Sequence, residues 1–321
     1  MGRSDTRPRH PTPRWAPALL LAIAVTGAAI TVFRDGLTGH ARELRGACRV
    51  ISGPGGEVLL HTSLPVFTGD GFVASSNRSY RVVEVGGDYA RAEPVTEGEQ
   101  PVVTEPCYAH GAAANGGPGG LSAMPLGLTT RVIVIYHTHT DESYVPGDGS
   151  ASTPGRGGIV AVGGSLRQAL ESVGYAVIHD QTVHAPHDAM AYVRSRRTAY
   201  SNLKYQPYLT FDIHRDGGPA SGYLTDVGGQ TTCQILLVVG RQNPLMAANL
   251  SVARRIKAAA DASYPGLIKG IFLARGHYNQ DLDPGALLIE VGSEHVPRAL
   301  AVRSMGLFAE VLARTFGAPG I

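Results

Sequence analysis

From about residue 129 to the C terminus, apolar strand segments alternate with amphipathic helix segments. The strand segments are continuous runs rich in β-branched residues, which is typical of strands covered on both faces. Strands that alternate with helices predict a sheet with helices on both of its faces. We therefore expect an α/β fold over residues 129–321 with a mixed, mostly parallel sheet. The expected strands are 131–139, 175–180, 208–214, 231–240, 267–276 and 286–292, and the expected helices are 159–174, 189–203, 244–264 and 296–316.

An apolar segment near the N terminus predicts membrane attachment. Residues 15–33 carry no charge over 19 positions, which is close to the ~20 residues that a helix needs to cross a bilayer core. Residues 1–14 hold four arginines and one aspartate, so the positive-inside rule makes them a cytoplasmic tail. We expect a single-pass cell-membrane protein whose remaining chain is extracytoplasmic. The alternative is a signal peptide cleaved near Ala28, which places the same part of the chain outside.

Two further segments precede the α/β region. Residues 41–104 contain short runs with period-two alternation, separated by glycine-rich turns. This pattern predicts a small β-rich region, either a spacer or a binding module. Residues 105–128 are rich in glycine and alanine, which predicts a flexible linker.

Charge, cysteines and missing motifs exclude several classes of protein. A net charge of +2 gives no broad basic field, so electrostatics do not support a nucleic-acid partner. Three cysteines without a CxxC pair are too few for a disulfide scaffold or a structural zinc site. Cys48 and Cys107 can pair in an oxidising compartment, whereas Cys233 is expected in the core. The chain also lacks the GxSxG, Walker and GxGxxG motifs.

Polar clusters follow three of the predicted strands. They are HTHTDE at 137–142, FDIHRD at 211–216 and RGHYNQ at 275–280. In open α/β sheets, ligands bind just beyond the carboxyl ends of the strands. A single histidine at such an end is more often a hydrogen-bonded structural residue. Three clusters together indicate a functional site.

A lone carboxylate, Glu290, lies inside the last apolar strand segment. Burial of an unpaired carboxylate is costly, so Glu290 is expected to have a cation or metal nearby or to be protonated. Ion pairing is the simpler explanation for the acidic residues. In that interpretation Glu290 pairs with Arg275 and Asp212 pairs with Arg215.

Histidines and carboxylates at strand ends predict a metal-dependent hydrolase. Two histidines and one carboxylate form the ligand set of a catalytic zinc, and a further glutamate serves as the general base. His137 and His139 are two residues apart, so on a strand they are expected to point to the same face.

Three long motifs resemble the stage II sporulation protein P family. They are IVIYHTHTDESY (133–144), FDIHRDG (211–217) and ARGHYNQDLDPGALLIEVGS (274–293). The shorter stretches TSLPVFTGDGF (62–72) and GRQNP (240–244) resemble it too, and the likeness extends from the N-terminal span to residue 316. The resemblance implies a catalytic domain similar to zinc-dependent N-acetylmuramoyl-L-alanine amidases.

The resemblance also implies a biological role. The expected activity is peptidoglycan hydrolysis during engulfment of the forespore in endospore-forming bacteria. The expected bonds are the amide between N-acetylmuramic acid and the stem peptide, and the crosslinks between stem peptides. The expected partners are a membrane-embedded scaffold protein and a lytic transglycosylase.

The resemblance implies a zinc site made of His139, Glu142 and His214, with Glu290 as the catalytic glutamate. Alignment of the first strand favours His139 over His137 as the first ligand. In the simpler amidases the ligand glutamate comes later in the chain than Glu142 does here.

Further residues are expected around the zinc site. An arginine fork binds carboxylates in two places, so Arg215 and Arg275 are candidates, together with His277, to hold an oxyanion or a stem-peptide carboxylate. Asp141, Asp281 and Asp283 are secondary candidates among the acidic residues. Family members often carry an asparagine near the position of His295, where this chain reads SEHVPRA.

Two other functions fit the same residues. One is a metal-dependent hydrolase of a different cell-wall bond, such as a carbohydrate deacetylase. The other is a non-catalytic cell-wall binding scaffold, against which the intact His139, Glu142, His214 and Glu290 argue.

Overall fold

The computed structural model describes residues 48–96 and 131–317, apart from residue 189. All of these lie within one compact unit of the chain, residues 39–321. The predicted tail 1–14, span 15–33 and linker 105–128 lie outside the described residues, as does Cys107. Among the helices of the described part, none has the length and apolar character needed to span a bilayer.

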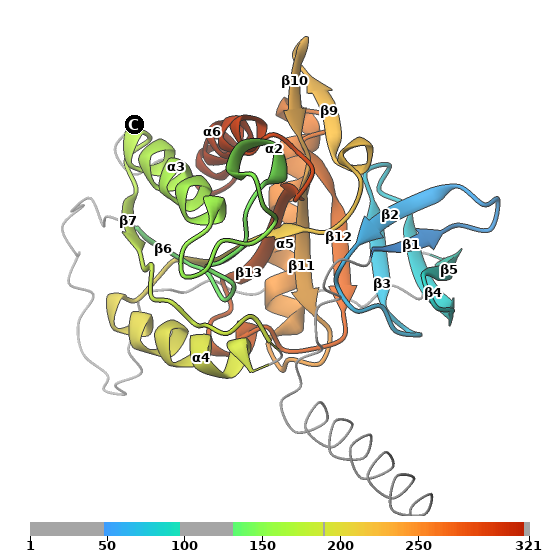
Figure 1. Ribbon diagram of the computed structural model, residues 1–321, viewed down its shortest axis with the longest axis horizontal. Coiled ribbons are helices and arrows are strands. Elements are labelled where there is room, and N and C mark those ends of the chain that lie inside the picture. The colour runs from blue at the N-terminus through green and yellow to red at the C-terminus, as the bar shows by residue number, and fades with distance from the viewer. Residues whose placement is uncertain (1–47, 97–130, 189, 318–321) are drawn as a thin grey trace, which may run out of the picture. The chain divides into compact units, whose positions relative to one another are not determined.

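One mixed sheet of 11 strands runs through the described residues (Figure 1). The N-terminal strands are β1 (Arg49–Ser52), β2 (Val58–Thr62), β3 (Gly71–Ala74), β4 (Ser79–Val85) and β5 (Tyr89–Pro94). The later strands are β6 (Val132–Tyr136), β7 (Ala176–His179), β8 (Leu209–Asp216), β11 (Ile235–Gly240), β12 (Ile268–Ala274) and β13 (Ala286–Ser293). Their order is β2-β1-β5-β4-β3-β12-β11-β13-β8-β6-β7.

Strand direction divides the later part of the sheet into two groups. β7, β6, β8 and β13 are parallel to one another. β11 and β12 are parallel to each other, but β11 pairs with β13 in the antiparallel sense. The sheet is therefore mixed, as predicted, and the carboxyl ends of the two groups lie at opposite edges.

Helices cover both faces of this part of the sheet, as predicted. α3 (Gly158–Ser172), α5 (Met246–Ser263) and α6 (Arg298–Phe316) pack over one face, where their apolar side chains join a core with Ile133 and Ile135. α4 (Ala191–Asn202) covers the other face, where Ala199 packs with Val134 and Tyr136. The short helical turns are α2 (Val145–Asp148), η2 (Leu203–Tyr205), η3 (Ala220–Gly222) and η4 (Gln280–Leu282).

The single strand predicted over 231–240 is wrong, because two strands occupy that range. β10 (Gln230–Cys233) forms a separate antiparallel hairpin with β9 (Leu224–Val227), and β11 begins at Ile235. Gln234 separates the two strands. Its backbone N–H donates to the carbonyl of Tyr223, which lies outside the main sheet. Cys233 is buried at the end of β10, in agreement with its predicted place in the core.

The described part of the predicted β-rich region, residues 48–96, is built of strands, and it continues the sheet of the α/β part. β3 pairs with β12 in the antiparallel sense, with Phe72 opposite Phe272. A buried carboxylate adds a second connection. Asp216, at the end of β8, accepts hydrogen bonds from Thr62 Oγ1 at 3.0 Å and from the backbone N–H of Ser63 at 2.7 Å. Burial raises the pKa of Asp216 to about 6, so these donors are needed to stabilise its charged form.

We predict that Thr62→Val lowers the free energy of unfolding of the full-length chain by about 1–3 kcal/mol. The substitution keeps the side-chain volume and removes one donor from the buried carboxylate of Asp216. The measurement is urea unfolding followed by circular dichroism. The matched control is Thr68→Val at an exposed position, where the change should stay within about 0.5 kcal/mol. Equal effects of the two substitutions would contradict the role given to Thr62.

Candidate functional site

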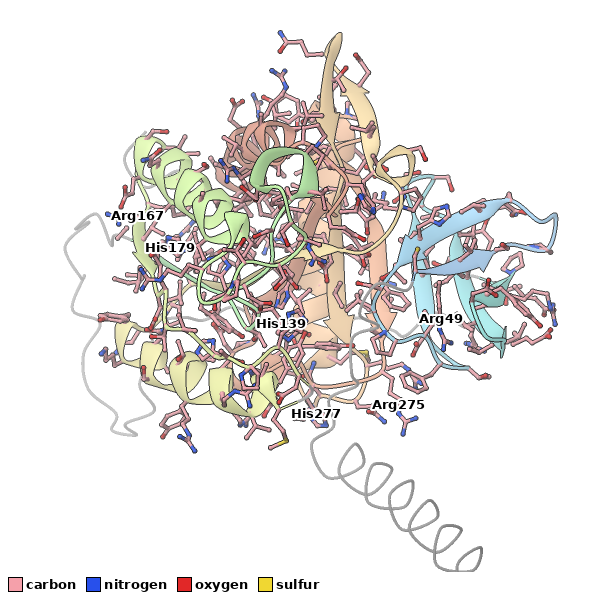
Figure 2. All side chains as sticks on the ribbon, in the orientation of Figure 1. Arg49, His139, Arg167, His179, Arg275 and His277 are labelled. Atoms are coloured by element: carbon pink, nitrogen blue, oxygen red, sulfur yellow. The ribbon has the colours of Figure 1, made fainter. Side chains whose placement is uncertain are left out.

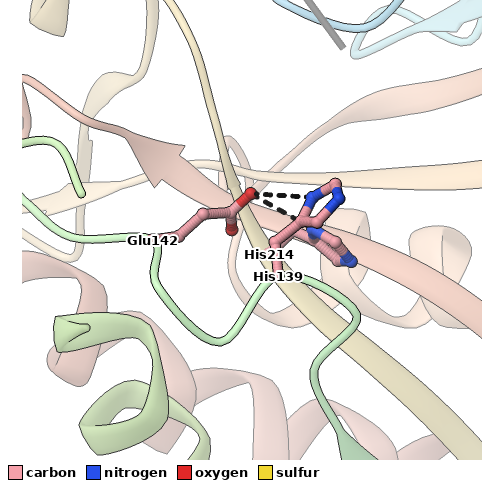
Figure 3. A group of neighbouring side chains, drawn as sticks. All are labelled: His139, Glu142 and His214. Carbon is pink, nitrogen blue, oxygen red and sulfur yellow. Dashed lines mark hydrogen bonds and ion pairs between the residues drawn. The ribbon is translucent and has the colours of Figure 1, made fainter. Parts of the chain in front are cut away.

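Three side chains from two distant parts of the chain meet in the interior: His139, Glu142 and His214 (Figure 3). Oε1 of Glu142 lies 3.4 Å from Nδ1 of His139 and 3.3 Å from Nδ1 of His214. All three residues are buried, and one potential ligand atom from each lies within 4.8 Å of the others. The structure thus brings together the three residues predicted as metal ligands.

The hydrogen bonds made just after the end of β6 determine that His139 and His214 lie close together. The strand stops at Tyr136, and the next two residues bind β8. Nδ1 of His137 donates to the carbonyl of Ile213 at 2.8 Å. Thr138 donates to Asp212 through its backbone N–H at 2.8 Å and through Oγ1 at 2.6 Å. The chain then turns, and His139 faces His214.

The prediction that His137 and His139 share one face is wrong, because β6 ends before either residue. His137 lies under α3, next to Gly163, and its Nε2 is 2.9 Å from Nε2 of His179. Burial, together with His179, lowers the pKa of His137 to about 4, so this imidazole is neutral at pH 7.

Glu142 and His214 influence each other's charge. Burial alone would raise the pKa of Glu142, but His214 and His139 outweigh it and hold that pKa below its ordinary value. Burial would lower the pKa of His214, but the carboxylates of Asp212 and Glu142 raise it well above the ordinary range. The backbone N–H of Arg215 donates to Oε2 of Glu142 at 2.9 Å. The cluster therefore attracts a cation, which is either a proton on His214 or a metal ion that replaces it.

Glu290 lies beside this cluster. It is directly opposite His214 in the parallel pairing of β13 with β8, so both side chains are on the same face, one strand spacing of about 4.8 Å apart. Glu290 is 1% exposed. The next residue of β13, Val291, is bound by the loop after Glu142: the hydroxyl of Tyr144 donates to the carbonyl of Val291 at 2.9 Å.

Arg215 is close to the cluster, but its guanidinium contacts a loop. Nε donates to the carbonyl of Ser143 at 3.2 Å and an Nη donates to the carbonyl of Ala151 at 2.8 Å. Both acceptors belong to the segment that follows Glu142. Arg215 therefore fixes the loop that carries a candidate ligand.

Arg275 and His277 are not brought to the cluster (Figure 2). They follow β12, which runs opposite to β8 and β13, so they lie at the edge where β13 begins. Glu290 is four residues into β13, which is about 13 Å along the strand. The guanidinium of Arg275 is exposed and lies 4.8 Å from the ring centroid of Phe67.

The secondary acidic candidates also have other partners. Asp281 pairs with Arg196 at 2.7 Å. Asp283 accepts a hydrogen bond from Oγ1 of Thr210 at 2.6 Å. Asp141 lies 3.0 Å from Nδ1 of His187.

Two aromatic residues that the sequence did not indicate line the cluster. The ring of His187 stacks on that of His139, with centroids 3.8 Å apart and planes at 15°. The ring of Tyr192 lies 5.5 Å from His139 and 6.3 Å from His214. His187 lies between a predicted strand and a predicted helix, where no periodic pattern exists. Its spacing from His184, as His-x-x-His, was the available signal.

The donor set fits zinc. Two imidazole nitrogens face the same carboxylate oxygen, and two histidines with one carboxylate make a three-ligand protein set that leaves a position for water. His139, Glu142 and His214 would hold the ion in this arrangement.

Comparison with known proteins shows which protein family the chain belongs to. The model of the family described as Stage II sporulation protein P matches residues 92–313. The Stage II sporulation protein P of Bacillus subtilis (strain 168) is 30% identical over 182 residues, which is 50% of this chain and 45% of that protein. The match therefore spans less than half the length of that curated relative.

Several solved structures are similar to part of the chain. The CwlD amidase from Clostridioides difficile in complex with the GerS lipoprotein has a TM-score of 0.42 at 12% identity, and covers 58% of this chain and 98% of that one. The apo form of the N-acetylmuramyl-L-alanine amidase Ami1 from Mycobacterium abscessus has a TM-score of 0.37 at 15% identity, and covers 58% and 96%. The family is given by the sequence match and not by these structures.

Proposed function

The chain belongs to the stage II sporulation protein P family, and from this membership and the site we propose that it is a zinc-dependent peptidoglycan hydrolase that acts during endospore engulfment. The proposed bond is the amide between N-acetylmuramic acid and the stem peptide, with crosslinks between stem peptides as a second target. The observation that carries the proposal is the buried set of His139, Glu142 and His214 with Glu290 beside it.

The proposed reaction is hydrolysis of an amide by water. Zinc, when bound, supplies a Lewis acid that polarises a carbonyl and acidifies water. Glu290 takes one proton from the attacking water and gives it to the nitrogen of the leaving amine, so the carboxylate is regenerated. Its place opposite His214 supports this role, because it lies next to a candidate ligand without being one of the three.

The surroundings of the site support the same chemistry. The three candidate ligands are buried, so water is scarce around them and electrostatic interactions are strong. Arg215 holds the loop after Glu142 through the carbonyls of Ser143 and Ala151. In this proposal it is a positioning residue, and no substrate contact is assigned to it.

The proposed location is the outer side of the cell membrane. It rests on the uncharged segment 15–33 and on the arginines before it. The proposed partners, a membrane-embedded scaffold protein and a lytic transglycosylase, follow from the family resemblance alone.

We predict that the full-length chain in detergent releases free stem peptides from purified peptidoglycan, as measured by mass analysis of the soluble products. A chelator should abolish the release and added zinc should restore it, because the candidate ligands form a zinc set. Full activity after exhaustive metal removal would overturn the metalloenzyme proposal. Loss of acetyl groups alone would indicate a deacetylase, and zinc-loaded protein that binds peptidoglycan without products would indicate a scaffold.

We predict different defects for the base and for a ligand. Glu290→Gln should keep the fold and the zinc while turnover falls by about 10²–10⁴-fold, the range for loss of a general base. His139→Ala should lose both zinc affinity and activity. Metal content by mass spectrometry and product release give the two readouts.

His137→Ala is the matched control, because it removes a buried histidine of the same motif that faces His179 instead of Glu142. It should retain zinc with partly reduced activity. If His137→Ala loses zinc and His139→Ala keeps it, the choice of ligand is wrong. Loss of zinc from Glu290→Gln would make Glu290 a ligand.

A further inference from the structure

We propose that Asp212 is a positioning residue whose carboxylate, in contact with Nε2 of His214, keeps the proton of the imidazole on Nε2, so that Nδ1 is presented to the metal. The proposal rests on the proposed function, because it assumes that the cluster binds zinc. It assigns a role to the acidic residue of the FDIH motif, which the ligand set leaves unexplained.

The two ring nitrogens of His214 have different neighbours. Nε2 lies 3.0 Å from Oδ1 of Asp212, and Nδ1 lies 3.3 Å from Oε1 of Glu142. Asp212 and His214 are two residues apart on β8 and therefore share a face. An imidazole whose proton is on Nε2, beside a carboxylate, keeps the lone pair on Nδ1, which is the atom that faces the other candidate ligands.

Asp212 is itself held in place. It is 2% exposed, and both of its oxygens accept hydrogen bonds from Thr138, Oδ1 from the backbone N–H at 2.8 Å and Oδ2 from Oγ1 at 2.6 Å. Oγ1 of Thr138 also lies 2.7 Å from Oγ of Ser195 in α4. The carboxylate is thus fixed before the metal arrives, and it fixes His214 in turn.

Asp212 does not take the place of a ligand. It is at the opposite nitrogen of the His214 ring from Glu142, and the two nitrogens of an imidazole point away from each other. A metal ion at the cluster is therefore separated from Asp212 by the ring. Carboxylates in this position orient the histidine and increase its basicity, and their loss typically weakens metal affinity by about 10–100-fold.

The test is the zinc affinity of the full-length chain, measured by competition with a chromophoric chelator. Asp212→Asn should bind zinc about 10–100-fold more weakly than the unsubstituted chain. The matched control is Asp283→Asn, which alters another buried aspartate that accepts from a threonine hydroxyl but lies outside the cluster. Its zinc affinity should stay within about twofold. If Asp212→Asn binds zinc as tightly as the control does, the proposal is overturned.

A second measurement covers the case in which Asp212→Asn does not fold. Long-range ¹H–¹⁵N spectra of the zinc-loaded, unsubstituted chain report which nitrogen of His214 carries the proton. The expected result is a protonated Nε2 and a metal-bound Nδ1. The reverse pattern would overturn the role of Asp212 while leaving zinc binding and hydrolysis intact. Zinc binding with no peptidoglycan products would instead overturn the proposed function.

Discussion

The contacts between the end of β6 and the middle of β8 determine where the candidate site forms. His137 donates to the carbonyl of Ile213, and Thr138 donates twice to Asp212. These bonds hold the two chain segments together just before His139 and His214 emerge from them. The middle threonine of the HTH motif and the aspartate of the FDIH motif are therefore bonded to each other. This connection determines the positions of the histidines that follow them, His139 and His214.

The same region concentrates negative charge in the interior. Asp212, Glu142, Glu290 and Asp216 are all buried around β8 and β13, where an unpaired carboxylate is costly. Each of three has donors that offset the cost: Thr138 for Asp212, the N–H of Arg215 for Glu142, and Thr62 with Ser63 for Asp216. The donors to Asp216 come from the N-terminal strands, so this region supports the end of β8 as well as extending the sheet.

Local patterns in the sequence predicted most of the elements and the polar clusters at the strand ends, because each element end is encoded by nearby residues. The grouping of His139, Glu142 and His214 came from the family resemblance. Strand direction is not encoded in this way. Periodicity gave no sign that β11 and β12 run opposite to β13, and this reversal separates Arg275 and His277 from the cluster. The stacking of His187 on His139 depends on an irregular loop, and the joining of β3 to β12 depends on a tertiary contact. Neither leaves a periodic signal.

The central claim is that His139, Glu142 and His214 form one zinc site. X-ray absorption at the zinc edge of the zinc-loaded full-length chain tests it most directly. We predict two imidazole nitrogens at about 2.0–2.1 Å, oxygen ligands at about 2.0–2.2 Å and no sulfur, with one imidazole lost in His139→Ala. A shell with sulfur at about 2.3 Å, or one that keeps both imidazoles in His139→Ala, would contradict the account.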